Sequence, residues 1–259
     1  MFPEERHIAL ACRLADAAGA VSRRHFRAGL EADDKPDRSP VTEADRAAER
    51  AMREILGVEA PGDGILGEEQ GPEREDAELV WVLDPIDGTK AFVAGKPLFT
   101  TLIGLLRRGR FVIGVIDQPV IGDRWVGAAG RPTRFGDAPA RCRACPSLDR
   151  ARLSTSGPEY FAADDLGAFQ RVAARAKLVT YGGDGYQYGL VASGSLDVVV
   201  ESGLKIHDFA SHVPVIEGAG GVVTDWSGRP LGPTSAGDVV AAGDARVHAE
   251  VLAALRRPG

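Results

Sequence analysis

The sequence predicts an α+β fold built in layers. Three observations lead to this prediction: a start with helical spacing, a set of short apolar segments joined by tight turns, and an alternation of strand-like and helix-like segments in the second half. The chain has 259 residues, of which 44% are hydrophobic, and this suffices for a sizeable core. Such a length predicts one large domain or two small ones, at roughly 150 residues each.

Two helices are predicted at the start of the chain. Apolar residues recur near helical spacing from Glu4 to Phe26. Residues 31–40 then contain two prolines and four acidic residues, which predicts a mobile loop. A second helix is expected to begin near Thr42, because Thr42 is a candidate N-cap with Asp45 three residues later.

Strand-like patterns begin after residue 64, with short apolar runs at 65–66 and 80–83 that end at acidic residues. Three antiparallel strands are expected next, at 100–106, 111–116 and 124–127. The second half is predicted to alternate strands at 152–155, 178–181, 197–201 and 221–225 with helices at 166–176, 185–192, 208–219 and 245–256. A boundary near residues 138–148 would divide the chain into an N-terminal α+β subdomain, 1–140, and a C-terminal α/β subdomain, 141–259.

Composition excludes several classes of protein. The net charge of −6 argues against a dedicated nucleic-acid binder. No apolar stretch reaches the ~18 residues of a membrane helix, and the acidic start lacks the apolar block of a secretory signal. A cytoplasmic protein with no membrane partner is therefore expected. The three cysteines include a single C-x-x-C pair, Cys142 and Cys145, which are expected to be ordinary thiols.

The most distinctive segment is WVLDPIDGTK at residues 81–90. An apolar run leads into Asp84, Pro85 fixes the backbone, and a second acid, Asp87, follows. Two carboxylates at the end of a strand can share a hard cation such as Mg²⁺, which takes oxygen ligands. A capped turn made by Asp-Pro and Asp-Gly is the alternative explanation of the same residues.

The residues after Asp87 predict a place for a phosphate group. Gly88 permits a tight turn, and a helical turn is expected to start at Thr89. The backbone N–H groups of Gly88, Thr89 and Lys90 would then lie at a helix N-terminus, which favours an anion. Metal and phosphate sites side by side indicate phosphoryl chemistry.

Three other segments supply further candidate acids. Glu68 and Glu69 follow the run at 65–66, Asp45 lies in the predicted capping box, and Asp208 lies where a helix is expected to begin. Each has an ordinary explanation on its own. The glutamates could lie in a solvated loop, and the aspartates could simply cap helices.

Together these segments form a known pattern. The sequence resembles the inositol monophosphatase superfamily of metal-dependent, lithium-sensitive phosphatases. The elements G-E-E at 67–69, D-P-I-D-G-T at 84–89 and D-x-A at 208–210 occur in the family's order and spacing, and residues 217–228 resemble its E-A-G-G strand entry. The resemblance implies a layered α/β/α/β/α sandwich, a homodimer, and a small phosphorylated metabolite as the substrate.

The resemblance also implies a set of Mg²⁺ ligands. Glu68, Asp84 and the backbone carbonyl of Ile86 would hold one ion. Asp84, Asp87 and Asp208 would hold a second. A third ion near Glu68 would bring the number to two or three. On this basis the N-terminal subdomain carries most of the metal ligands, and the C-terminal one carries the last ligand and the substrate residues.

Three residues are implied to be catalytic: Thr89, Asp45 and Glu68. Thr89, with Asp45 behind it, would orient the attacking water, and a loop carrying Lys35 would close over the site. Metal ions lower the pKa of bound water and neutralise charge on the phosphoryl oxygens. The sequence has no evident nucleophile with a partnered base, so direct attack by water is preferred over a covalent intermediate.

Three departures favour the histidinol-phosphatase branch of the superfamily. Lys90 follows D-G-T, Asp184 lies in YGGDGYQY, and LKIHDF stands where many members have W-D. A substrate with an amine or imidazole needs acids around its leaving group, and Asp184 and Glu201 could supply them. The predicted substrate residues are Asp87, Gly88, Thr89, Lys90, Gly183, Asp184, Glu201 and Asp208.

The predicted function is therefore an Mg²⁺-dependent hydrolase of L-histidinol phosphate in histidine biosynthesis. An inositol-1-phosphatase or a broader sugar-phosphate phosphatase is the first alternative, and a non-catalytic metal-binding member of the family is the second. His207 stands at a position where many members have Trp. It is expected to be structural, because the carboxylates already satisfy a hard metal.

Overall fold

The structure is a computed structural model that describes residues 4–29, 33–34 and 40–256. Lys35 and most of the predicted 31–40 loop lie outside these residues. From that segment the structure describes a small antiparallel pair, β1 (Asp33–Asp34) with β2 (Pro40–Val41). Within the described ranges, no helix has the length and apolar character needed to cross a membrane.

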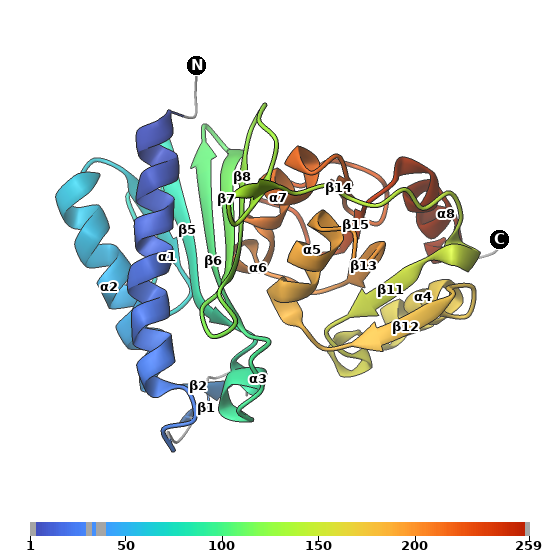
Figure 1. Cartoon of the computed structure of the whole chain (residues 1–259), viewed down its shortest axis with the longest axis horizontal. Coiled ribbons are helices and arrows are strands. Elements are labelled where there is room, and N and C mark those ends of the chain that lie inside the picture. Colours follow the sequence, from blue (N-terminus) through green and yellow to red (C-terminus); the bar gives the residue numbers. More distant parts are fainter. Residues whose placement is uncertain (1–3, 30–32, 35–39, 257–259) are drawn as a thin grey trace.

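The first half builds one sheet with helices on its outer face (Figure 1). Helices α1 (Glu5–His25) and α2 (Glu43–Glu59) pack on this sheet and on each other. The strand order is β10-β9-β8-β7-β6-β5-β3-β4, and only β3 and β5 pair in parallel. The strands are β3 (Gly64–Gly67), β4 (Pro72–Glu73), β5 (Leu79–Asp87), β6 (Thr100–Arg107), β7 (Arg110–Gln118), β8 (Asp123–Ala128), β9 (Arg134–Phe135) and β10 (Ala138–Pro139).

The second half builds a five-stranded sheet in the order β12-β11-β13-β15-β14. Its strands are β11 (Arg152–Thr155), β12 (Leu178–Tyr181), β13 (Val198–Glu201), β14 (Val222–Thr224) and β15 (Val239–Ala242). Its helices are α4 (Ala163–Ala173), α5 (Asp184–Ala192), α6 (Ile206–Phe209), α7 (His212–Gly218) and α8 (Ala245–Leu255).

Three apolar clusters fill the spaces between these layers. One joins α1 and α2 to the first sheet and includes Leu14 and Trp81. A second, with Trp125 and Phe209, lies where α5, α6 and α7 stand between the two sheets (Figure 1). A third, with Phe169, joins the second sheet to α4 and α8. The predicted α/β/α/β/α layering is thus confirmed, whereas the subdomain boundary near residue 141 stays a prediction.

Two of the longer elements differ from the sequence prediction, and the two-residue strands β1, β2, β4, β9 and β10 were not expected. The helix expected at 208–219 is two short helices, α6 and α7, which meet at Ala210 and Ser211. Strand β15 was missed, although it is paired on both sides in the second sheet. Its four apolar residues are too few to show a period, so sequence spacing cannot distinguish this strand from a buried turn.

A row of glycines lets the second half lie directly on the first sheet. Gly104, Gly114 and Gly127 are cross-strand neighbours on β6, β7 and β8. A methyl group on Gly104 would lie 2.8 Å from the Ala210 side chain, and one on Gly114 would overlap the carbonyl group of Ser211. Because these glycines lack side chains, the junction of α6 and α7 can touch the sheet backbone and place Asp208 beside it.

We expect Gly114→Ala to move this junction away from the sheet. Such overpacking costs about 1–3 kcal/mol of unfolding free energy, and it should also weaken divalent-metal binding through Asp208. Thermal denaturation and calorimetric metal titration measure the two effects. Gly57→Ala is the matched control, since a methyl group there meets nothing within 4 Å. An unchanged Gly114→Ala protein would contradict the role given to the glycine row.

Candidate active site

The end of β5 places Asp84 and Asp87 on one side of the sheet. In a regular strand, residues three apart point to opposite faces. Here the pairing with β6 shifts between Asp84 and Asp87, so β5 contains one extra residue, as in a β-bulge. The extra residue turns Asp87 toward the face to which Asp84 points. Thr101 Oγ1 fixes this irregularity by donating a 2.8 Å hydrogen bond to the Pro85 carbonyl. Both carboxylates therefore face the same space.

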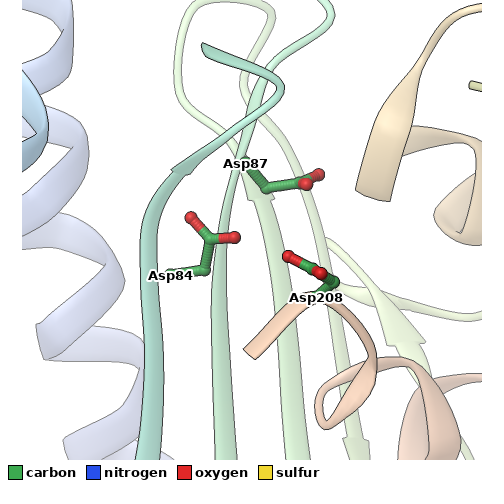
Figure 2. Close-up of side chains that lie close together, drawn as sticks. All are labelled: Asp84, Asp87 and Asp208. Atoms are coloured by element: carbon green, nitrogen blue, oxygen red, sulfur yellow. The ribbon is translucent and has the colours of Figure 1, made fainter. Parts of the chain in front are cut away.

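Asp208 completes a cluster of three carboxylates. It lies on α6, which the glycine row holds against the first sheet, and Lys205 N donates a 2.6 Å hydrogen bond to its Oδ2. One oxygen from each of Asp84, Asp87 and Asp208 lies within 4.8 Å of the other two. Figure 2 shows the three side chains facing a common space. The structure thus brings together residues that are 124 positions apart in the chain (208 − 84).

The charges in this cluster are unbalanced. Asp84 is 1% exposed, and its Oδ1 has no hydrogen-bond partner among the described residues. Burial raises the pKa of Asp84 well above its usual range, and the charges of Glu68, Asp87 and Asp208 raise it further. Burial also raises the pKa of Asp87 and of Asp208. Buried, converging carboxylate oxygens fit a hard divalent cation, which would relieve the repulsion and occupy the unpartnered oxygen.

Asp87 is held from the second half of the molecule. Its Oδ2 accepts hydrogen bonds from the Gly185 backbone N–H and, at 3.1 Å, from Thr100 Oγ1. A methyl group on Gly185 would lie 2.7 Å from that oxygen and 2.6 Å from Thr100 Oγ1. The start of α5 therefore orients Asp87 through its backbone, and only glycine allows this close approach. Sequence reasoning missed both partners.

Glu68 is positioned by a buried acid that the sequence analysis also missed. The fully buried Glu49 on α2 accepts hydrogen bonds from Glu69 N at 2.7 Å and Gln70 N at 3.2 Å. Arg53 Nε donates to the same carboxylate at 2.7 Å. In the sequence, Glu49 and Arg53 form an ordinary i,i+4 pair of the kind usually found on an exposed helix face. Here that pair fixes the loop that directly follows Glu68.

Thr89 and Asp45 meet as the resemblance implied. Thr89 Oγ1 lies 3.3 Å from Asp45 Oδ1 and 3.1 Å from the Ile86 carbonyl. The other oxygen of Asp45 closes the predicted capping box with Thr42, accepting from its backbone N–H at 2.8 Å. Helix capping and orientation of Thr89 are thus two uses of one carboxylate.

A cavity of about 410 Å³ opens beside the cluster. It is lined by Glu68, Asp84, Ile86, Asp87, Gly88, Thr89, Lys90, Asp184, Glu201 and Asp208, among others. Gly183 does not belong to the described lining; with φ +112° it caps α5 and so sets the position of Asp184. Asp45 lies behind Thr89, as expected.

The lining of the cavity also contains a buried acceptor, Glu201. Its Oε1 accepts hydrogen bonds from Ser156 N and Gln187 Nε2, both at 2.9 Å, and also from the Ser156 hydroxyl. Its Oε2 accepts from Tyr188 Oη at 2.7 Å. Burial raises the pKa of Glu201 to about 7, although the hydrogen bonds from Ser156 and Tyr188 oppose the shift.

Lys90 and Tyr160 form one wall of the cavity. Lys90 Nζ lies 4.1 Å from the centre of the half-exposed Tyr160 ring. Asp184 lies nearby with the left-handed φ of +40°, and the Lys90 charge lowers its pKa while burial raises it more. Tyr160 and Ser156 were missed because only the fold brings their segment to this cavity.

Glu49→Gln should weaken divalent-metal binding by roughly 10–100-fold, the usual loss for a residue that orients a metal ligand. The amide cannot accept both loop N–H groups and the Arg53 guanidinium in the same way, so Glu68 loses its fixed position. Calorimetric titration with Mg²⁺ measures the change. Glu54→Gln, on an exposed part of the same helix, should bind the metal like the wild type. Equal affinities in both variants would contradict this role of Glu49.

The stabilisation by divalent metal should increase with pH. A carboxyl group whose folded-state pKa is raised contributes stability below its unfolded pKa of ~4, and this is lost as the pH rises through the folded value. Metal binding replaces these protons. At 100 times Kd, Mg²⁺ should add about 2.7 kcal/mol of stability at pH 8 and less at pH 5. Thermal melts with Mg²⁺ or with a chelator measure the difference, and a pH-independent difference would contradict the prediction.

Comparison with known proteins places the chain in a family. Residues 4–258 match the inositol monophosphatase family. The bifunctional phosphatase IMPL2 of Arabidopsis thaliana is 46% identical to this chain, and the match covers 97% of this chain and 75% of IMPL2. A histidinol-phosphatase of Mycobacterium tuberculosis is 38% identical, and the match covers 95% of this chain and 96% of that protein. The solved structure of an inositol monophosphatase from Zymomonas mobilis is 48% identical, with a TM-score of 0.91 over 98% of this chain and 99% of that one. The chain belongs to the inositol monophosphatase family of metal-dependent phosphatases.

Proposed function

We propose that the chain hydrolyses L-histidinol phosphate to L-histidinol and phosphate, with Mg²⁺ as the metal. The observation that carries this proposal is the buried carboxylate of Glu201, which lines the cavity together with Asp184. The two acids offer acceptors for a cationic leaving group. The similarity to a histidinol-phosphatase over almost the whole chain supports the same substrate.

Glu201 has room for one further donor. Each of the two carboxylate oxygens has about two lone-pair sites, so an oxygen with a single donor can accept one more hydrogen bond. The donors on Oε1 are Ser156 N, Ser156 Oγ and Gln187 Nε2, whereas Tyr188 is the one described donor on Oε2. A substrate ammonium or imidazole N–H can therefore bind Oε2. A cation beside it favours the ionised carboxylate and so offsets the raised pKa.

The phosphate end would be held by the motif at the end of β5. We assign Glu68, Asp84, the Ile86 carbonyl, Asp87 and Asp208 to two or three Mg²⁺ ions, as the resemblance implies. When bound, the ions neutralise charge on the phosphoryl oxygens and lower the pKa of water. Lys90 and the backbone N–H groups of Gly88 and Thr89 bind the phosphate.

Thr89 would position the water that attacks phosphorus. Its hydroxyl proton is directed to Asp45 Oδ1 or to the Ile86 carbonyl, so an oxygen lone pair remains to accept from the water. Glu68 lines the same cavity as Thr89. The water adds to phosphorus as the bond to the ester oxygen breaks, and the proton that the attacking water loses to solvent is matched by one that the departing alkoxide takes from solvent, so that it leaves as the alcohol toward Glu201 and Asp184.

An inositol monophosphatase is the alternative, and the 48% identical solved structure favours it. A neutral polyol could bind Glu201 Oε2 through a hydroxyl group instead of a charged N–H. A non-catalytic member of the family is disfavoured, because such a protein would not need Glu68, Thr89 and the three aspartates together. The expected homodimer and cytoplasmic location stay predictions.

Thr89→Ala should lower kcat by at least about 100-fold, since the water loses its acceptor. Metal affinity should remain near the wild-type value, because the Thr89 side chain is not assigned to a metal. Steady-state kinetics with saturating Mg²⁺ and calorimetric titration measure the two quantities. A wild-type kcat in the Thr89→Ala variant would refute the assignment of Thr89 to the attacking water. Full activity of the wild-type protein in excess chelator would refute the metal-dependent mechanism.

The substrate proposal predicts that kcat/KM for histidinol phosphate exceeds that for inositol 1-phosphate by at least about tenfold. A charge-assisted hydrogen bond at a desolvated site contributes ~1.5–3 kcal/mol, or about 10–150-fold. Glu201→Gln and Asp184→Asn should reduce this preference while leaving hydrolysis of an aryl phosphate nearly unchanged. Glu54→Gln is the control for Glu201→Gln and should keep the wild-type ratio. Equal ratios in all variants would favour the broad-specificity alternative.

A further inference from the structure

A stacked pair of buried rings contacts Glu201. The rings of His212 and Tyr188 lie face to face, with their centres 3.8 Å apart and their planes 20° from parallel. Each of the two residues is 1% exposed, and both belong to the lining of the cavity. The Tyr188 hydroxyl donates to Glu201 Oε2 at 2.7 Å. The imidazole therefore contacts the side chain that supplies the described hydrogen bond to this oxygen.

The imidazole is itself fixed by the preceding residue. His212 Nδ1 lies 3.2 Å from the hydroxyl oxygen of the buried Ser211, which is within hydrogen-bond reach. The backbone carbonyl of Ser211 lies on the bare backbone of Gly114 in the first sheet. A continuous run of contacts thus leads from the first sheet to the ring of Tyr188, and through its hydroxyl to Glu201.

His212 contributes a ring without a charge. Burial lowers the pKa of His212 to about 3, so the imidazole is neutral at neutral pH. Burial also raises the pKa of Tyr188 well above its usual range, so the phenol keeps the proton that it donates. Stacked aromatic rings stabilise each other beyond the area that they bury. Such a contact can hold the phenol in one orientation without changing the charge around Glu201.

We propose that His212 is a positioning residue, which holds the Tyr188 ring so that its hydroxyl donates to Glu201 Oε2. This fixed bond leaves the other lone pair of Oε2 to the leaving group of the substrate. The inference rests on the role of Glu201 in the proposed function, although the hydrogen bond exists whichever substrate binds. Ordinary core packing is the competing explanation, and it would be satisfied by any apolar side chain of similar size.

The pKa of Glu201 reports on the Tyr188 hydrogen bond. Burial raises this pKa, and the bonds from Ser156 and Tyr188 lower it. Nuclear magnetic resonance of ¹³C-glutamate protein measures the titration with saturating Mg²⁺ in every sample, and the signal missing in Glu201→Gln identifies Glu201. In His212→Leu the acid dissociation constant of Glu201 should fall by about 3–10-fold, the range expected for the loss of one stacked pair.

Three further variants separate positioning from packing. His212→Phe keeps a ring and should retain the wild-type titration. His248→Leu is the matched control and should also retain it, because His248 is buried, bonds Thr224 and lies outside the described cavity lining. Tyr188→Phe removes the hydroxyl, so adding His212→Leu to it should change the titration no further. Such non-additivity is expected of two residues that act through one bond.

Steady-state kinetics gives a second readout. In His212→Leu the preference for histidinol phosphate over inositol 1-phosphate should fall by about 3–10-fold, mainly through a higher KM for histidinol phosphate. The kcat should stay near the wild-type value, because His212 is assigned no contact with the metal ligands or with the attacking water. Hydrolysis of an aryl phosphate should change little.

Three results would overturn the proposal. They are a wild-type Glu201 titration in folded His212→Leu, an equal change in His212→Phe, and a change of the same size with and without Tyr188→Phe. If His212→Leu does not fold, Ser211→Ala, which releases His212 Nδ1, takes its place under the same criteria. The titration uses no substrate. A changed Glu201 pKa without a preference for histidinol phosphate would therefore refute the proposed function and leave the role of His212 intact.

Discussion

The site depends on the direct contact between the first sheet and the junction of α6 and α7. Gly104 and Gly114 leave the sheet surface bare where Ala210 and Ser211 lie on it, and Gly127 does the same beneath Pro214 of α7. Without this approach, Asp208 would not reach the end of β5, and the carboxylate cluster would lack its third member. The layered fold thus brings an acid from the second half against a pair of acids from the first, and these three acids line the cavity.

The same contact places buried carboxylates close together, and their mutual repulsion favours the binding of a divalent cation. Burial and mutual repulsion raise the pKa of Asp84 and Asp87. Without metal these carboxylates therefore tend to bind protons, and a divalent cation would replace those protons. The surrounding structure holds this arrangement through neutral donors: Thr100 and the Gly185 N–H on Asp87, and Lys205 N on Asp208. These groups fix the carboxylates without neutralising them, and the charge remains available for divalent ions.

Sequence reasoning could predict what is local and missed what is assembled from distant segments. Asp84, Asp87 and the turn at Gly88 follow from an apolar strand that ends at acids, and the Thr42–Asp45 capping box was visible as a spacing. Asp208 looked like a helix cap until the family resemblance gave it a role. Glu49, Gly185 and Tyr188 gave no signal, because their importance lies in hydrogen bonds to residues 13 to 98 positions away. His207 was expected to be structural because the carboxylates already satisfy a hard metal, and its place at the cavity wall, 3.6 Å from Asp208 Oδ1, could not be predicted from the sequence.

Anomalous diffraction from a crystal grown with Mn²⁺ tests the central claim most directly, since it locates bound ions without reference to activity or substrate. The account predicts a strong peak within bonding distance of Asp84, Asp87 and Asp208, with the α6–α7 junction still seated on the glycine row. Mn²⁺ bound elsewhere, or carboxylates that stay separated with no ion between them at saturating Mn²⁺, would contradict it.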